Sequence, residues 1–597
     1  ALLWRLGSPG LGIHDLMLQP IDRVSDFFAR LALPAPLDEA ADLLLGEIRA
    51  RLDFLVRVGL GYLTLDRQSR TLSGGEVQRI NLTTALGTSL TNTLFVLDEP
   101  SIGLHPRDMH RVIEVMQRLR SAGNSLVVVE HDPQVMLAAD RMIDIGPGPG
   151  ERGGRIVFNG TPAEIQAGDT LTGQYLSGRR QVELPLLTTG GYATRNVRPN
   201  TPRLLLEGAR EHNLKNVSVE LPLNHLVVIT GVSGSGKSTL VADVLYPALA
   251  KAKGKSTESP GAYDRLLGDD WLADVAMVDQ SPIGKTTRSN PASYVGAWDA
   301  IRQLFARTPL AQERGYTAGH FSFNAGDGRC PTCGGNGFEH VEMQFLSDVY
   351  LRCPDCDGKR FRPEVLEVRI ERGGLSLSVA DVLALTVSEA VQYFGNHPEV
   401  IRGLQPLAEV GLEYVKLGQP VPTLSGGEAQ RLKIAGFLAE AAKMGIGYAP
   451  VGGRLARKGS LLLFDEPTTG LHFDDVSRLM RALRKLLAAG HSLVIIEHNL
   501  DVIRSADWII DLGPEGGDAG GEIVIAGTPR EVMSHPTSHT GRALADYERK
   551  MGSESIFPEA DAEARKLDSD PIFAAEPSGK YLATARRENA ITIKHAR

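Results

Sequence analysis

The sequence has 597 residues, enough for about four domains of roughly 150 residues each. Its charged fraction of 23% and hydrophobic fraction of 42% are ordinary for a globular protein. The net charge of −8 gives no general attraction to nucleic acid, so any such contact must be local. No uncharged apolar run approaches the ~20 residues of a membrane span and no signal peptide is evident, which excludes a transporter with its own membrane domain.

The start of the chain is helical by pattern, because residues 43–59 repeat apolar side chains with a period of 3.6. The first residue, Ala1, is not a Met, and residues 1–10 resemble the middle of a domain. We therefore expect an N-terminal part to precede this sequence.

Three motifs occur twice in the same order. Each copy has a Ser-Gly-Gly-Glu loop, then an apolar strand ending in Asp-Glu-Pro, then an apolar strand ending in Glu-His. The interval from Asp98 to His131 is 33 residues, as is that from Asp465 to His498, and an Asp-x-Gly-Pro motif follows each histidine. A repeat held over this distance predicts a duplicated domain. The second copy has 15 extra residues before Asp465, which we place in a surface loop within residues 441–460.

A phosphate-binding loop occurs only once. Residues 231–239 fit G-x-x-x-x-G-K-[ST] and lie between an apolar run at 226–230 and an apolar helix start at 240–245. The glycines let backbone N–H groups converge on phosphate oxygens, while Lys237 reaches the β- and γ-phosphates and Ser238 ligates Mg²⁺. The predicted nucleotide-binding residues here are Gly231, Ser233, Gly234, Ser235, Gly236, Lys237, Ser238 and Thr239.

The Asp-Glu and Glu-His motifs suit nucleotide hydrolysis. Asp465 at a strand end can hold Mg²⁺ through water, and Glu466 can act as general base on the attacking water. His498 can contact the γ-phosphate. A single Asp-Glu-Pro would more simply be a solvated acidic turn, but two copies in the same setting favour chemistry.

Four cysteines form two C-x-x-C pairs, at Cys330 and Cys333 and at Cys353 and Cys356. Four thiolates at this spacing can close a tetrahedral Zn²⁺ site with no open position, which predicts a structural metal. The alternative is four free buried cysteines. Their confinement to one short stretch favours a metal in a reducing cytosol over disulfides.

These motifs together resemble the ABC ATPase family. The resemblance implies an α/β fold of tandem ABC-type P-loop domains arranged head-to-tail, with an inserted four-cysteine zinc module and helical signature subdomains. In that family each nucleotide lies between one phosphate loop and the signature of the other domain. The complete site is then residues 231–239 with Gln280, Asp465, Glu466 and His498, closed by Ser73, Gly74, Gly75 and Glu76.

The second site of the pair lacks a phosphate loop, because nothing between residues 1 and 72 fits the pattern. Either that loop lies upstream of Ala1 or the site is inactive. Its residues would be Ser425, Gly426, Gly427, Glu428, Asp98, Glu99 and His131.

The cysteine module between phosphate loop and signature narrows the resemblance to the UvrA family, and residues 279–291, 321–324 and 417–420 match it as well. This implies an ATPase, cytoplasmic and associated with the nucleoid, that recognises damaged duplex DNA in nucleotide excision repair without nuclease activity of its own. ATP, Mg²⁺ and Zn²⁺ are the implied cofactors. The implied partners are damaged double-stranded DNA, a UvrB-like helicase subunit and a second copy in a homodimer.

This sequence departs from the family pattern in two ways. The UvrB-docking and insertion regions of the family are not seen, and the 15-residue excess is more like a divergent paralogue. Such paralogues are associated with tolerance to DNA-binding drugs, which is one alternative function. A tandem ABC translation factor on ribosomes is a third, but it is not expected to carry a four-cysteine insert.

A locally basic stretch at residues 285–320 gives the candidate DNA contacts, for which the alternative is an ordinary solvated face. We expect Lys285, Arg288 and Arg314 to bind phosphates. The predicted regions are residues 1–180 (the end of the first ABC domain), 181–202 (linker), 203–284 (ATP-binding core), 285–415 (signature and zinc insert), 416–548 (the rest of the second ABC domain) and 549–597 (a mobile tail).

Overall fold

The computed structural model describes residues 10–31, 39–69, 72, 74–87, 91–182, 197–281, 283, 288–341, 349–443 and 458–552. Most of the predicted tail and most of the loop expected within residues 441–460 lie outside these, although residues 549–552 of the tail belong to a helix. The chain divides into compact units at 1–547 and 548–597, and of the second only the end of helix α21 (His539–Gly552) is described. Among the described helices, none is both long enough and apolar enough to cross a membrane.

A six-stranded sheet forms the core of the second repeat, in the order β17-β16-β7-β15-β14-β9. The central strand β7 (Leu226–Gly231) is buried along its whole length, as expected for an apolar run between parallel neighbours. Its neighbours are β15 (Ser492–Ile496) and β16 (Trp508–Gly513). The remaining strands are β14 (Leu461–Asp465), β9 (Val275–Val278) and the antiparallel β17 (Glu522–Gly527).

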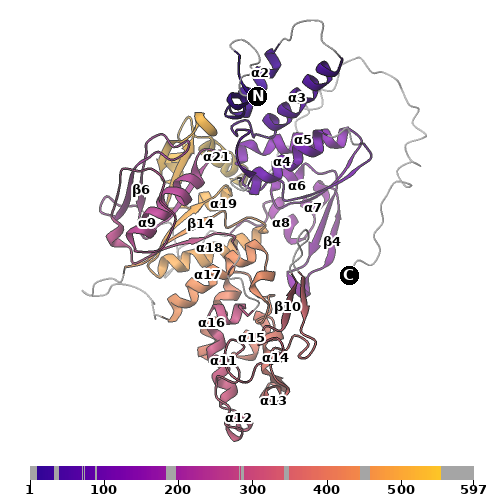
Figure 1. Ribbon diagram of the computed structural model, residues 1–597, viewed down its shortest axis with the longest axis vertical. Coiled ribbons are helices and arrows are strands. Elements are labelled where there is room, and N and C mark those ends of the chain that lie inside the picture. The colour runs from indigo at the N-terminus through magenta and orange to yellow at the C-terminus, as the bar shows by residue number, and fades with distance from the viewer. Residues whose placement is uncertain are drawn as a thin grey trace, which may run out of the picture. The chain divides into compact units, whose positions relative to one another are not determined.

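Helices cover this sheet. After the phosphate loop the chain forms a π-helical segment, η4 (Thr239–Leu245), and then α9 (Tyr246–Ala252). Helices α17 (Gly426–Lys443) and α18 (Phe473–Ala488) pack on each other beside β14 (Figure 1). A three-stranded sheet of β5 (Arg203–Ala209), β6 (Val217–Pro222) and β8 (Arg265–Leu267) completes this core.

The segment between phosphate loop and second signature combines helices with short hairpins. Helix α11 (Ala297–Ala306) packs closely on α16 (Pro398–Glu409), where a Cβ at Gly403 would lie 2.8 Å from the Cβ of Ala297. Two hairpins lie in this segment, β10 (Phe338–Val341) with β11 (Val349–Arg352) and β12 (Arg369–Arg372) with β13 (Leu375–Ser378). The smaller helices are α10 (Pro291–Tyr294), α12 (Pro309–Glu313), α13 (Pro363–Leu366), α14 (Val379–Ala384) and α15 (Val387–Tyr393).

The first repeat contains the counterparts of four of the six core strands. The parallel pair β1 (Leu94–Asp98) and β2 (Ser125–Val129) matches β14 and β15, and the antiparallel pair β3 (Met142–Gly146) and β4 (Arg155–Gly160) matches β16 and β17. Its helices are α1 (Ile13–Met17), α2 (Ile21–Arg30), α3 (Glu39–Arg57), α4 (Gly74–Gly87), α5 (Met109–Ser121), α6 (Pro133–Leu137), α7 (Pro162–Ala167) and α8 (Leu171–Leu176).

The first-repeat strands are far more exposed than their counterparts. In the described chain no strand lies between β2 and β3, whereas β7 fills that place in the second repeat. Val96, Val127 and Ile145 are 68%, 50% and 67% exposed, while the matching Leu463, Val494 and Leu512 are at most 1% exposed.

Candidate active site

The phosphate loop leaves β7 at Gly231 and folds back over the end of the sheet. The Lys237 Nζ donates to the carbonyl oxygens of Gly231 and Val232, at 3.0 and 2.9 Å. Gly231 has a φ of +132° and a Cβ there would lie 1.9 Å from the Leu512 carbonyl oxygen, so only glycine fits. Burial lowers the pKa of Lys237 to about 8, although the charges of Glu466, Asp511, Asp465 and Asp108 oppose this.

Two carboxylates follow β14 at the same end of the sheet. Burial raises the pKa of Asp465 to about 6. The pKa of Glu466 rises to about 8, through burial first and then through the charges of Asp465 and Glu497. The His498 Nε2 lies 4.0 Å from Glu466 Oε1, and burial holds the pKa of that imidazole far below its usual value, so the ring is neutral. The first repeat has the same pair, with Glu99 Oε1 3.9 Å from His131 Nε2.

The two repeats face each other across this site. The Ser233 hydroxyl of the phosphate loop donates to the Gly103 carbonyl of the first repeat at 3.2 Å. A Cβ at Gly103 would lie 3.3 Å from Glu466 Oε1, and one at Gly470 would lie 2.9 Å from Glu99 Oε1. Each acidic motif is therefore covered by the turn that follows the other acidic motif.

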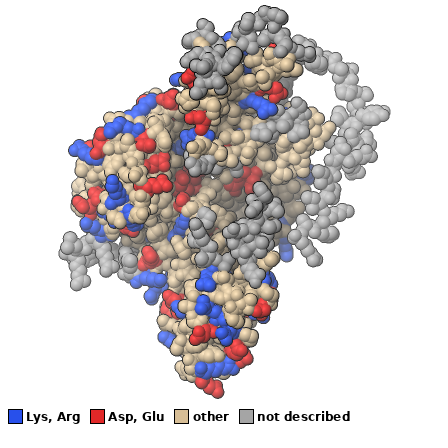
Figure 2. All heavy atoms as spheres, in the orientation of Figure 1, with Lys and Arg blue, Asp and Glu red and all other residues tan. Residues whose placement is uncertain are grey.

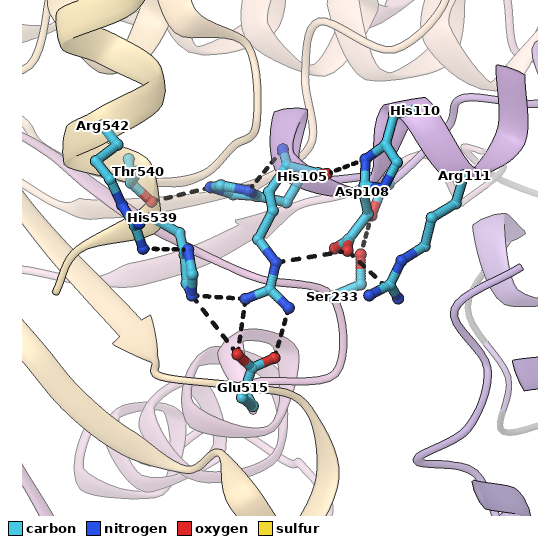
Figure 3. Close-up of polar contacts among 11 residues, drawn as sticks. His105, Asp108, His110, Arg111, Ser233, Glu515, His539, Thr540 and Arg542 are labelled. Carbon is cyan, nitrogen blue, oxygen red and sulfur yellow. Dashed lines mark hydrogen bonds and ion pairs between the residues drawn. The ribbon is translucent and has the colours of Figure 1, made fainter. Parts of the chain in front are cut away.

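A polar network joins the repeats next to the phosphate loop (Figure 3). Arg107 of the first repeat donates to both carboxylate oxygens of Glu515, at 2.9 and 2.6 Å, and to His539 Nε2 at 2.6 Å. The backbone N–H of Arg107 donates to His105 Nδ1. The other ring nitrogen of His105, Nε2, therefore carries the proton and donates to Thr540 Oγ1 at 3.1 Å. The Thr540 hydroxyl in turn donates to Asp511 Oδ1 at 2.8 Å.

Sequence reasoning did not single out His105, Arg107, Glu515 and Thr540. One signal was available, because His105 and His472 stand at the same place in the two repeats. Each of these histidines contacts a threonine of the opposite repeat, because His472 Nε2 lies 3.2 Å from Thr172 Oγ1 just as His105 Nε2 contacts Thr540 Oγ1. The network also accounts for the Asp-x-Gly-Pro motif of the second repeat, in which Asp511 binds Thr540 and Ser538.

The two signature loops lie at helix starts. Ser73 lies outside the described residues, Gly74 and Gly75 begin α4, and the buried Glu76 accepts a hydrogen bond from the Tyr62 hydroxyl at 2.5 Å. In the second repeat Gly426 and Gly427 begin α17, and the Ser425 N–H donates to Glu428 Oε2 at 2.8 Å.

Gln280 lies against the signature of its own repeat, where a Cβ at Gly426 would be 3.3 Å from Gln280 Oε1. The preceding Asp279 is held by Lys433 Nζ at 2.6 Å. The place of Gln280 in the composite nucleotide site stays a prediction.

The four cysteines converge on one point. Their sulfur atoms all lie within 4.8 Å of one another, and all four side chains are buried. The Cys333 and Cys356 sulfurs are 3.7 Å apart, too far for a disulfide but close to the ~3.8 Å edge of a tetrahedron with Zn–S bonds of about 2.3 Å. Backbone N–H groups of Gly337 and Arg360 donate to these two sulfurs, at 3.2 and 3.4 Å. The arrangement fits a four-coordinate metal ion such as zinc.

The candidate DNA residues are not brought together by the described structure. Lys285 lies outside the described residues. Arg288 Nε donates to Asn336 Oδ1 at 2.8 Å, and Arg314 pairs with Glu367 and donates to the Glu364 carbonyl at 2.9 Å. On the face shown in Figure 2, Lys and Arg are interspersed with Asp and Glu.

The parallel sheet, the phosphate loop and the two acidic motifs covered from the opposite repeat define the class of this protein as an ABC-type ATPase fold. The α/β fold expected from the sequence is confirmed. No family model matches the chain.

Individual proteins match it over nine tenths of its length. UvrABC system protein A of Thermus thermophilus is 52% identical over 539 residues, 90% of this chain and 54% of that protein. The namesake proteins of Methanothermobacter thermautotrophicus and Aquifex aeolicus are 50% and 49% identical over 90% and 91% of this chain. The crystal structure of UvrA2 from Deinococcus radiodurans superposes with a TM-score of 0.78 at 43% identity, covering 90% of this chain and 63% of that one.

The resemblance to the UvrA family is thereby confirmed. The chain spans about half the length of the curated relatives it matches, between 53% and 56%.

Proposed function

We propose that this chain binds and hydrolyses ATP between its two repeats and couples that reaction to recognition of damaged duplex DNA. The contact between Ser233 and Gly103 is the observation that carries the proposal. It brings the acidic turn of the first repeat to the phosphate loop of the second, so nucleotide bound there would touch both halves.

The geometry of the site supports the following roles. Residues 231–239 hold the phosphates. Lys237 Nζ, which donates to the loop carbonyls in this structure, would donate to phosphate oxygens instead when nucleotide is bound. Bound Mg²⁺, held by Ser238 and Asp465, would neutralise charge on the phosphates. Glu466, in its deprotonated form, takes the proton from the attacking water. The neutral His498, whose Nε2 lies 4.0 Å from Glu466 Oε1, donates to the γ-phosphate. Ser73, Gly74, Gly75 and Glu76 close the site from the first repeat.

Similarity to UvrABC system protein A over 90% of this chain supports the DNA-repair assignment and a UvrB-like subunit as partner. A homodimer is the proposed assembly. The four cysteines would hold a structural Zn²⁺ that fixes the insert. Drug tolerance and ribosome binding are the competing functions.

Gel-shift binding separates these functions. We expect tighter binding to a lesion-bearing duplex than to undamaged duplex or ribosomal RNA, and equal affinity for all three would contradict the repair function. For hydrolysis, Lys237→Ala should abolish phosphate release from ATP, because it removes the cation that faces the phosphates.

The DNA contacts are tested by salt dependence. Each lost phosphate contact lowers the slope of log affinity against log salt by about one. Arg288→Ala and Arg314→Ala should each do so, whereas Arg265→Ala, on β8, is the matched control. An unchanged slope removes the two arginines from the interface.

A further inference from the structure

Tyr62 belongs to the first repeat, but its ring lies on the phosphate loop of the second. A Cβ at Gly234 would lie 2.7 Å from Tyr62 Cε2, and one at Gly517 would lie 2.7 Å from Tyr62 Cβ. A Cβ at Gly516 would lie 3.3 Å from the ring. Gly234 and Gly517 also have positive φ values of +75° and +62°. The three glycines form a flat platform, and Tyr62 can pack against it because glycines have no side chains to occupy that space.

This platform is tied together by hydrogen bonds. The Gly517 N–H donates to the Gly234 carbonyl at 3.0 Å. The Asn213 amide donates to the same carbonyl at 3.0 Å and to the Gly517 carbonyl at 3.2 Å. These hydrogen bonds tie the part of the phosphate loop beneath Tyr62 to the loop after β16.

The other end of Tyr62 reaches the first signature helix. Its hydroxyl donates to Glu76 Oε1 at 2.5 Å, and Glu76 is the third residue of α4. Burial raises the pKa of Tyr62 far above its usual value, so the hydroxyl keeps its proton and remains a donor. A hydrogen bond to a charged acceptor in a buried setting is stronger than one between neutral groups.

The backbone around Tyr62 is fixed by the first repeat. Its neighbours Leu60 and Leu63 are buried in the core of that repeat. The start of α2 holds the same loop by two backbone hydrogen bonds. The Ile21 N–H donates to the Leu63 carbonyl at 2.8 Å, and the Asp22 N–H donates to the Gly61 carbonyl at 3.0 Å. Tyr62 therefore cannot follow a movement of the phosphate loop unless the first repeat moves too.

The second repeat contains a matching tyrosine that serves as an internal control. The Tyr414 hydroxyl donates to Glu428 Oε1 at 2.7 Å, with the same sequence spacing as Tyr62 and Glu76. Its ring lies against Gly150, the counterpart of Gly517, where a Cβ would be 2.5 Å from Tyr414 Cβ. The difference is that the platform of Tyr62 includes the phosphate loop.

We propose that Tyr62 is a positioning residue of the composite ATP site, which keeps the signature helix of the first repeat aligned with the phosphate loop of the second. The inference rests on the proposed function. Tyr62 acts through Glu76 and Gly234 and touches no reacting atom, so it should affect turnover and not nucleotide affinity.

A double-mutant cycle of ATP hydrolysis tests this in the full chain, with Tyr62→Phe, Glu76→Ala and the combined variant. Phe keeps the ring on the glycine platform and removes only the hydroxyl, so the fold is retained, which circular dichroism checks. We expect Tyr62→Phe to lower kcat roughly tenfold with KM unchanged, and the combined variant to be no slower than Glu76→Ala. Tyr414→Phe, the matched control, should hydrolyse ATP at the wild-type rate.

Three results would overturn the inference: additive effects of the two substitutions, a raised KM with kcat preserved, or an equal loss in Tyr414→Phe. Failure of the proposed function is seen separately, as an absence of hydrolysis in the wild-type chain or a Lys237→Ala variant as active as wild type. Binding of a fluorescent ATP analogue to Tyr62→Phe provides the second measurement, and weakened binding would also count against the inference.

Discussion

Two glutamates, Glu99 and Glu466, adopt the same unusual backbone conformation in the two repeats. Their φ values are +46° and +42°, in the left-handed region that costs a residue with a side chain about 1–3 kcal/mol. Each follows a strand-end aspartate and directs its carboxylate at a glycine of the opposite repeat. Such strain is retained where the surrounding structure fixes it, and at Glu466 it points the carboxylate into the proposed hydrolytic site.

Substitution of Glu466 tests its role as general base. Glu466→Gln keeps the shape of the side chain but cannot accept a proton, so we expect ATP turnover to fall at least a hundredfold with ATP binding preserved. Stopped-assay phosphate release and equilibrium nucleotide binding measure the two quantities. Hydrolysis at a wild-type rate would show that another group activates the water.

The raised pKa of Glu466 predicts a pH dependence of stability. Its pKa is about 8 in the folded protein against an ordinary value of 4.5. Between these values the folded protein holds a proton that the unfolded chain has released, so the free energy of unfolding should fall as pH rises through this window. Glu466→Gln removes this effect. Urea unfolding at pH 5 and pH 8 should show a decline smaller by a few kcal/mol in the variant, and equal declines would contradict the burial of a proton at Glu466.

At the scale of elements, the cysteine module combines two short C-x-x-C turns with the β10–β11 hairpin between them. The four cysteines of the module form a buried cluster of their own, separate from the main hydrophobic core. Because the buried cluster contains only the four cysteines, the two C-x-x-C turns depend on a bound metal to hold them together.

Loss of one ligand should therefore release the metal. Cys353→Ser leaves three thiolates, and we expect zinc content, measured by atomic absorption, to fall from about one per chain to near zero, with loss of ellipticity from the insert. Thr332→Ser, which lies between two of the cysteines but contributes no sulfur, is the matched control. Full zinc retention in Cys353→Ser would contradict the four-cysteine site.

The core strands were predictable from sequence because their apolar runs end in charged motifs, as at Asp98 and Asp465. The helix expected at residues 240–245 is a π-helical segment, η4, since an apolar run does not distinguish helical hydrogen-bond patterns. The contact of His105 with Thr540 could not be predicted, because 435 residues separate them and no local pattern encodes that approach. Tyr62 was missed for the same reason, since its partner Gly234 is on the other repeat. The predicted domain boundaries stay predictions.

At the scale of the whole molecule, the two repeats meet through the turns that follow their acidic motifs. The strands of the first repeat expose Val96, Val127 and Ile145. The repeats share polar contacts such as Arg107 with Glu515, and apolar ones such as Tyr175 stacked on Phe473. The β7–β15–β16 core of the second repeat has no comparable exposure. Burial of apolar surface is the main source of stability, so the two halves should differ in how readily they open.

Amide hydrogen exchange measures that difference. We expect the amides of β1 and β2 to exchange at least tenfold faster than those of β7 and β15, through local opening that leaves the second repeat folded. Equal protection in both repeats would show that they open together.

The contact between the turn at Gly103 and the phosphate loop also bears on the stability of the first repeat. A ligand that binds the closed arrangement and not the opened one stabilises the former by mass action. ATP held between Ser233 and the turn at Gly103 would therefore act as a folding cofactor for the first repeat, and its presence should slow exchange in β1 and β2 far more than in β7.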